Sequence, residues 1–105
     1  MVISLDQAKL HLRVDGDDED EVIKVYLGAA QSASARYLNR SIISDEGDRV
    51  GETDLVATDD VRAAILLTLG HLYANRENEI VGSITSSLKF AAVNLLTPYR
   101  IDMGV

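Results

Sequence analysis

The sequence contains no cysteine and has only one proline and few basic residues. Without cysteine the chain cannot form disulfides, thiolate zinc sites or cysteine nucleophiles. Ten Lys and Arg stand against seventeen Asp and Glu, which gives a net charge of −7. A stand-alone nucleic-acid binder needs a basic face, so this charge argues against that class. The uncharged stretches are too short to cross a bilayer, and the N-terminus has no signal-peptide pattern.

The chain otherwise has the composition of one folded domain. Its 105 residues are 47% hydrophobic and 26% charged, which is typical of globular proteins, and the length suits one hydrophobic core. We therefore expect residues 1–105 to form a single domain. Residues 1–57 carry twelve acidic and six basic residues, so most of the negative charge lies in the first half.

Two helices are predicted in the first part of the chain. Ser4 and Gln7 have the spacing of a capping box, which predicts a helix over residues 5–12. The acidic run 17–21 suits the first turn of a second helix, because the helix dipole is positive there. From this run to Leu38, apolar residues recur every three or four positions, which is helical periodicity.

Two further helices are predicted after residue 57. Thr58 suits an N-cap, and the apolar stripe after it predicts a third helix that ends near residues 75–78. A fourth helix is predicted over residues 86–96, and Pro98 stops it because proline disfavours helical geometry in the preceding residue. The predicted fold is all-α, a small four-helix bundle.

The long connector, residues 39–57, separates the second and third predicted helices. It is polar and contains two glycines, so a loop is expected, with short extended pieces at residues 42–43 and 55–56. Loops of this length inside small domains are often functional.

No catalytic residue, cofactor or metal site is predicted. A calcium loop beginning at Asp15 would need Gly at its sixth position and Glu at its twelfth, where this chain has Asp20 and Tyr26. A solvated acidic helix start is the simpler interpretation. His11 and His71 lack metal-ligand spacing, and the common phosphate-binding and nucleophile motifs are absent. We therefore expect no enzyme activity.

Small residues form a surface on the second predicted helix. The segment GAAQSASA, residues 28–35, admits the close approach of another helix, which would offset the unfavourable helix propensity of Gly28. Two interpretations stay open, in which this surface faces either the bundle core or a neighbouring subunit. The subunit-interface candidates are Gly28, Ala29, Ser32, Ala33 and, near the end of the third helix, Arg76.

Three stretches form a distinctive series along the chain: ISLDQAKLHLRVDGDDEDEVI, VRAAILLTLGHLYANRE and VNLLTPYRI. In this order, over almost the whole chain, they resemble the phage head–tail connector family, whose members are also called adaptor or head-completion proteins. The connector, residues 39–57, matches nothing in that pattern, and Ser86–Ser87 stand where members often have proline.

This resemblance implies a structural role in a virion. Members form a ring of about twelve copies that docks under the portal of a tailed phage or prophage. The ring extends the DNA channel and offers a surface to the next head-completion or tail protein. By resemblance we expect a ring-forming virion protein, present in the host cytoplasm during assembly and without a membrane partner. DNA is expected to pass without specific binding, because like charge disfavours adhesion.

The resemblance also implies a role for the C-terminal tail, residues 98–105. In the family this part tends to reach the portal, which makes Pro98, Tyr99, Arg100, Ile101 and Met103 the portal-interface candidates. A tail of this kind predicts that removing residues 99–105 leaves stability nearly unchanged. In the alternative interpretation, Tyr99 and Arg100 cap the bundle.

Two other classes of function stay open on the sequence. One is an acidic helical interaction module, antitoxin- or inhibitor-like, that binds a basic partner. The other is a metal-dependent enzyme that uses the carboxylates of residues 15–21.

Overall fold

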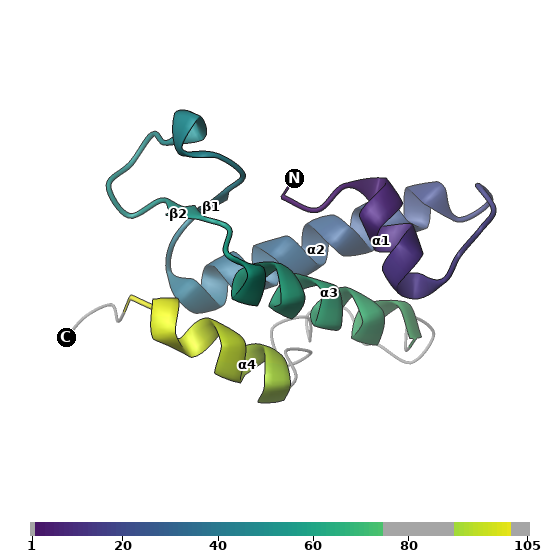
Figure 1. The fold of residues 1–105 in the computed structure, drawn as a ribbon. Coiled ribbons are helices and arrows are strands. Elements are labelled where there is room, and N and C mark those ends of the chain that lie inside the picture. The colour runs from purple at the N-terminus through teal and green to yellow at the C-terminus, as the bar shows by residue number, and fades with distance from the viewer. Residues whose placement is uncertain (1, 75–89, 102–105) are drawn as a thin grey trace.

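The computed structural model describes residues 2–74 and 90–101 of the chain. It confirms the predicted, mainly helical bundle with one long connector (Figure 1). The predicted start of the fourth helix at residue 86 lies outside the described residues. In chain order the elements are α1 (Leu5–Leu12), α2 (Asp20–Leu38), β1 (Ile42–Ile43), the 3-10 turn η1 (Glu46–Asp48), β2 (Leu55–Val56), α3 (Asp59–Ala74), α4 (Phe90–Leu96) and the 3-10 turn η3 (Thr97–Tyr99).

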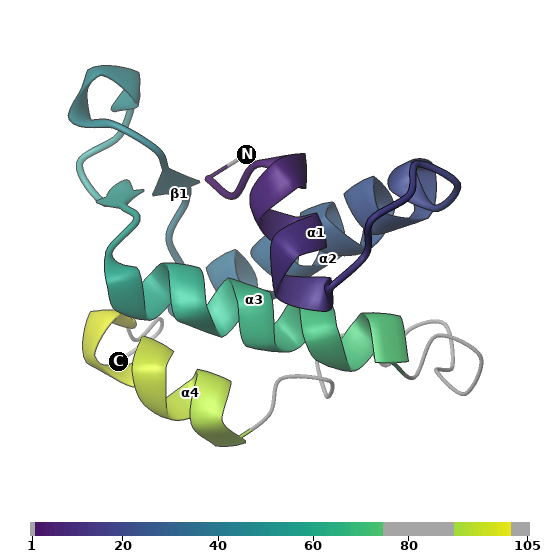
Figure 2. The ribbon, with the colours of Figure 1, turned by 45° about the vertical axis from the view of Figure 1, so that its right-hand side comes forward.

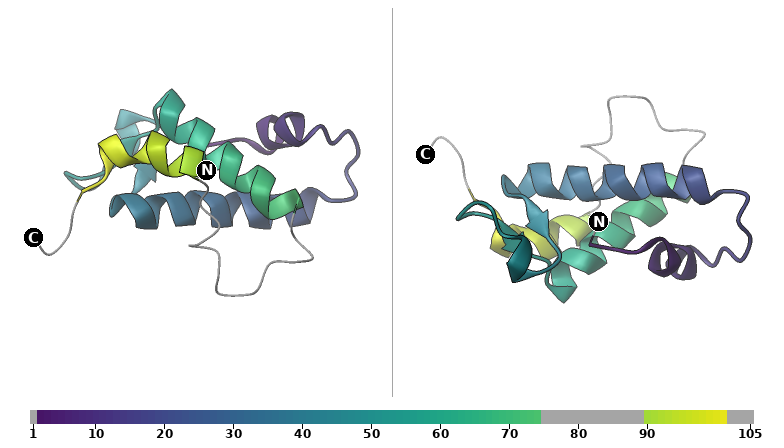
Figure 3. Two further views of the ribbon diagram at one scale, coloured as in Figure 1. Left: turned by 90° about the horizontal axis from the view of Figure 1, so that it is seen from below. Right: turned by 90° about the horizontal axis from the view of Figure 1, so that it is seen from above.

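The central element is α3, which contacts α1, α2 and α4. The helices α2 and α3 run antiparallel and cross obliquely, and α4 returns along α3 (Figure 3). Figure 2 shows α4 on one side of α3, and α1 and the connector on the other. The connector therefore projects from the bundle beside the C-terminal end of α2.

The hydrophobic core lies between α2, α3 and α4. The apolar residues that the helical period places on one side of α2 and α3 are buried, which confirms the periodicity argument. The largest fully buried apolar side chains are Ile23, Leu27, Leu38, Val61, Ile65, Leu69 and Leu96.

Predicted caps define the starts of α1 and α3. The Gln7 N–H donates to Ser4 Oγ at 3.1 Å, and the Ser4 N–H donates to Gln7 Oε1 at 3.0 Å, so the capping box is present. The Val61 N–H donates to Thr58 Oγ1 at 3.3 Å. Each bond satisfies a backbone donor that lacks a partner within its helix.

Polar contacts fix α1 and the start of α2. Lys9 Nζ lies 2.8 Å from Asp20 and 3.0 Å from Asp17, and hydrogen bonds to these two carboxylates raise the pKa of Lys9 above its ordinary value. The Tyr73 hydroxyl donates to Glu19 Oε2 at 2.6 Å and so ties α3 to the same acidic run. Part of the run predicted to be a solvated helix start is therefore structural.

The two short extended pieces predicted in the connector are confirmed as β1 and β2. They pair in parallel, with Ile42 opposite Leu55 and Ile43 opposite Val56. Ile42 is buried and joins the hydrophobic core. This bridge closes the base of the connector and holds it against the bundle.

The fourth helix ends at Leu96, as predicted. The chain then makes one more turn as the 3-10 turn η3, so helical geometry continues past the end of the α-helix and includes Pro98. The Thr97 hydroxyl donates to the Val93 carbonyl at 2.6 Å. Proline is tolerated in the first turn of a helix because its missing N–H needs no intrahelical partner there, and a 3-10 turn starting at Thr97 meets that condition.

Candidate functional site

The C-terminal segment, residues 97–101, packs onto the end of α2. The Ile101 N–H donates to the Leu38 carbonyl at 2.9 Å, and Asn39 Nδ2 donates to the Ile101 carbonyl at 2.7 Å. Asn39 has φ 58° and caps α2 in the left-handed conformation, which asparagine adopts more readily than most residues. The chain is thus attached where α2 leaves an unpaired carbonyl.

Aromatic and basic side chains strengthen this attachment. Arg100 Nε donates to the Tyr37 carbonyl at 2.9 Å, and its guanidinium lies 5.0 Å from the centre of the Tyr37 ring. The Tyr99 hydroxyl donates to Asp60 at 3.1 Å, and its carbonyl accepts from Arg40 Nη1 at 3.2 Å. The segment is therefore an ordered surface of the bundle.

Three of the five portal-interface candidates are thus brought together at the end of α2: Tyr99, Arg100 and Ile101. Pro98 is exposed beside them, and Met103 lies outside the described residues. The contacts of residues 99–101 favour the alternative interpretation, in which Tyr99 and Arg100 cap the bundle, and the effect of removing residues 99–105 on stability stays a prediction. Portal contact itself stays a prediction.

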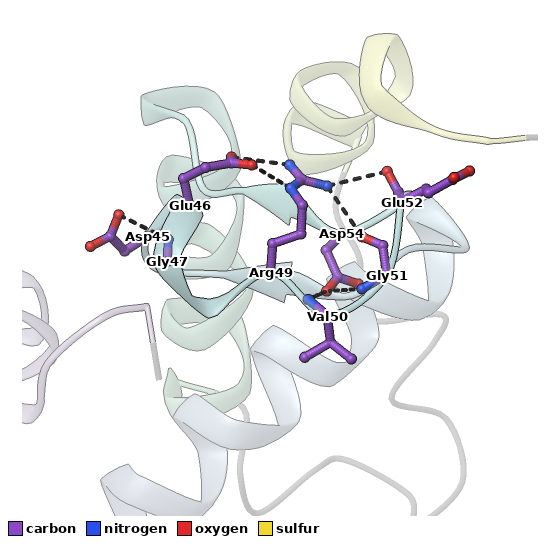
Figure 4. A network of polar contacts seen from close by, with 8 residues as sticks. All are labelled: Asp45, Glu46, Gly47, Arg49, Val50, Gly51, Glu52 and Asp54. Carbon is purple, nitrogen blue, oxygen red and sulfur yellow. Dashed lines mark hydrogen bonds and ion pairs between the residues drawn. The ribbon is translucent and has the colours of Figure 1, made fainter.

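The connector tip, residues 44–54, is held by a polar network that the sequence did not predict (Figure 4). The Arg49 guanidinium pairs with Glu46 and also donates to the carbonyls of Gly51 and Glu52, both at 3.2 Å. Asp45 accepts from the Gly47 N–H at 3.4 Å. The Asp45–Gly47 spacing is the one signal in the sequence for part of this network, since Asp commonly bonds the backbone two residues on.

Asp54 closes the network from the other side. Its carboxylate accepts from the N–H groups of Gly51 at 3.0 Å and Val50 at 2.9 Å. These two bonds lower the pKa of Asp54, and the nearby Arg49 adds to the effect. The hydrogen bond from Arg49 likewise lowers the pKa of Glu46. At neutral pH the tip is therefore a set of ionised, mutually bonded groups.

Val50 is displayed at this tip. Its side chain is 95% exposed, the most of any large apolar residue that the structure describes. Figure 4 shows the side chain pointing away from the Arg49 and Asp54 contacts. The sequence offered no signal for this, because an isolated valine in a polar loop has no periodic partner.

An open groove of about 380 Å³ runs beside the base of the connector. We call it the connector groove; its lining residues are Gly28, Gln31, Ser32, Ala35, Ser41 and Ile42. Two of the predicted subunit-interface candidates, Gly28 and Ser32, line it. The Val2 N–H donates to Gln31 Oε1 at 3.2 Å and so fixes one wall.

The other subunit-interface candidates lie elsewhere. Ala33 is 1% exposed, so this position belongs to the interior of the monomer and offers no free surface. Ala29 is half-buried, and Arg76 lies outside the described residues. The small-residue segment therefore has a buried side, which includes Ala33, and a surface side, which includes Ser32; a subunit contact at that surface stays a prediction.

Within residues 2–74 and 90–101, no group of three His, Asp or Glu side chains is placed to hold a metal ion. None of the described helices is long and apolar enough to span a membrane. The described residues present three distinctive surface features: the C-terminal segment, the connector tip and the connector groove.

A family model described as phage gp6-like head-tail connector protein matches residues 2–100. The chain belongs to this connector family. No match is found among curated proteins or among solved structures. The match covers α1 to η3, including the connector that the resemblance of the sequence phrases left unplaced.

Membership establishes the general role of this connector. The family is a structural one, whose members take part in joining phage heads to tails, and this supports a virion component that contacts other head or tail proteins.

Proposed function

We propose that this connector assembles into a ring of about twelve copies that docks under the portal and extends the DNA channel. The opposite side of the ring provides the attachment surface for the next head-completion or tail protein. The observation that carries the proposal is the family match over residues 2–100.

The C-terminal segment is the proposed contact with the portal, through Pro98, Tyr99, Arg100, Ile101 and Met103. Tyr and Arg are enriched among residues that dominate protein interfaces. Their attachment to α2 supports the proposal, because a surface ordered before binding loses little conformational entropy on docking.

The net negative charge of the chain is consistent with the proposed DNA channel. A ring of chains with a net charge of −7 each is strongly acidic, and like charge keeps DNA phosphates from adhering to its wall. The proposal assigns no sequence-specific DNA contact to the connector.

Genetic removal of the connector tests the role. A stop codon early in its gene, in a phage or prophage that carries it, should leave heads without attached tails, and the intact gene supplied in trans should restore complete particles. Complete, infectious particles assembled without the protein would contradict the proposal.

A charge reversal tests the portal contact. Arg100→Glu should abolish co-sedimentation with the cognate portal while the helical circular dichroism spectrum is retained. Arg13→Glu, at an exposed position at the end of α1, is the matched control and should bind as the wild type does. Equal binding by both variants would remove Arg100 from the contact.

A further inference from the structure

We infer that Val50 at the connector tip of one subunit inserts into the connector groove of the next subunit. This inference rests on the proposed ring and names the contact that builds it. It follows from three properties of the described surface: an exposed apolar side chain on a hydrogen-bonded tip, an uncharged groove, and the charges around each.

The backbone of the tip is held in place by hydrogen bonds within the tip itself. The backbone N–H groups of Val50 and Gly51 are both bonded to Asp54, and Arg49 is bonded to Glu46 and to two carbonyls. These contacts are internal to the tip, so they remain intact when the tip meets another surface. A backbone that is already held by hydrogen bonds loses little conformational entropy on binding, and Val50 is 95% exposed, so its side chain is available for burial.

The connector groove has the size and chemistry to receive a valine. Its volume of about 380 Å³ is open to solvent, and none of its six lining residues is charged. In a chain with a net charge of −7, an uncharged surface is where two copies can approach with the least repulsion. The absence of side-chain bulk at Gly28, Ser32 and Ala35 creates the hollow.

The charges beyond the groove favour a second copy of this tip. Residues 44–54 carry five acidic residues and one basic residue. Arg36 lies one helical turn after Ser32, so an exposed basic residue stands at one end of the groove along α2. At the other end, Lys24 lies one turn before Gly28 and is exposed, but its Nζ is 3.4 Å from Glu21 Oε1 on the same helix, so this pair is close to neutral. An acidic tip seated in the groove would therefore face the positive charge of Arg36.

This contact is heterologous, because the connector tip and the connector groove are different parts of the same chain. Each subunit then uses its tip on one neighbour and its groove on the other, and repetition closes a ring when the rotation allows it. A symmetric dimer would instead pair like surfaces and stop at two copies.

Cysteine pairs test the contact directly, since the natural chain has no cysteine. The double variant Val50→Cys, Ser32→Cys is oxidised with diamide, both as purified oligomer and in assembled particles. We expect a ladder of disulfide-linked dimers, trimers and larger species on a non-reducing gel. A compact monomer linked within itself, a product that stops at dimers, or no product at all would overturn the inference.

Single variants separate this contact from other proximities. A mixture of Val50→Cys and Ser32→Cys chains should give a linked dimer, whereas each variant alone should not. Leu10→Cys is the matched control, since Leu10 is also an exposed apolar residue, at 80%, but lies on α1, outside both surfaces. Leu10→Cys mixed with Ser32→Cys should remain unlinked; efficient linkage of this pair would also count against the inference.

The association constant provides a second measurement. Val50→Asp should weaken self-association roughly tenfold to a hundredfold, as expected for the lost burial of one valine, and Leu10→Asp, at an exposed position on α1, should leave it unchanged. Both variants should keep the thermal midpoint of the wild type. Equal association by the two variants would also overturn the inference.

The outcome is distinguishable from failure of the proposed function. If the connector is present in particles and required for tails, but the Val50 and Ser32 cysteines do not link, the role stands and this contact is wrong. If the protein is dispensable for tail attachment, the proposed function fails, whatever the cysteine pairs show in solution.

Discussion

The helical bundle of α2, α3 and α4 is held by buried apolar side chains, whereas the connector tip is held by polar contacts at the surface. In residues 44–54 only Asp54 is buried, and the tip keeps its shape through bonds made by Asp54, Arg49 and Asp45. The two regions therefore have different roles in the molecule. The bundle provides the stability of the fold, and the tip provides a fixed outline without adding to the core.

The comparison predicts that changes in the bundle act on the whole molecule. Leu69→Ala removes a fully buried side chain from the middle of α3, so we expect the free energy of unfolding to fall by about 2–5 kcal/mol, measured by urea denaturation. Leu67→Ala on the same helix is the control, since Leu67 is 39% exposed and loses less buried area, and it should lower stability by about 1 kcal/mol or less. Equal losses would mean that the outer face of α3 is also covered.

The C-terminal segment should behave as part of the bundle, although it was expected to be a free tail. A chain ending at residue 98 loses the partly buried Tyr99 and the bonds to Tyr37, Leu38 and Asn39. We expect a loss of about 1–3 kcal/mol of stability, seen as a lower urea midpoint. A chain ending at residue 101 keeps all of these contacts and should match the wild type. An unchanged urea midpoint for the shorter chain would show that the segment adds nothing to stability, as expected for a free tail.

A change inside the tip should have only a local effect. Asp54→Ala frees the N–H groups of Val50 and Gly51, so both amides should exchange faster with solvent hydrogen while the thermal midpoint stays in place. Asp48→Ala, at an exposed position in the same tip, is the control and should alter neither. A large drop in the midpoint for Asp54→Ala would show that tip and bundle unfold together.

The smallest expected effect is a pH dependence confined to the tip. Two N–H bonds lower the pKa of Asp54 from its ordinary value of 3.8. The contribution of Asp54 to tip stability is therefore fully present above that value and is lost as the pH falls through the lowered pKa of the folded state. The amide resonances of Val50 and Gly51 should move in this range, and the movement should be absent in Asp54→Ala. A midpoint at or above 3.8 would contradict the proposed bonding.

Much of the bundle could be predicted from the sequence, because helix formation is largely local. Ser4 and Gln7 identified a helix start, and the three-and-four spacing in α2 identified its buried side. The mode of attachment of the C-terminal segment could not be predicted, since it joins Ile101 to the distant Leu38 and depends on how α2 and α4 pack. The tip was missed because its contacts depend on loop conformation, which polar composition alone does not specify.

For the surfaces too, the local sequence pattern predicts only part of the arrangement. Small residues on α2 indicated a surface for close approach, but which of them are free depends on the helix orientation in the bundle. Ser32 lines the connector groove, and Ala33, the next residue, is buried. One position along a helix changes the direction of a side chain by about 100 degrees, so of two neighbouring residues one can be exposed and the other buried.

The bond between Asn39 and the Ile101 carbonyl spans 62 positions of the chain, and this span has a consequence for the order of folding. Closing so long a loop costs conformational entropy that only the packed helices can offset. We therefore expect the bond to form after the folding transition state, while contacts within the tip, three or four positions apart, close early. Weakening the bond should then speed unfolding and leave the folding rate almost unchanged. The attachment of the C-terminal segment would therefore determine the lifetime of the folded state through the unfolding rate.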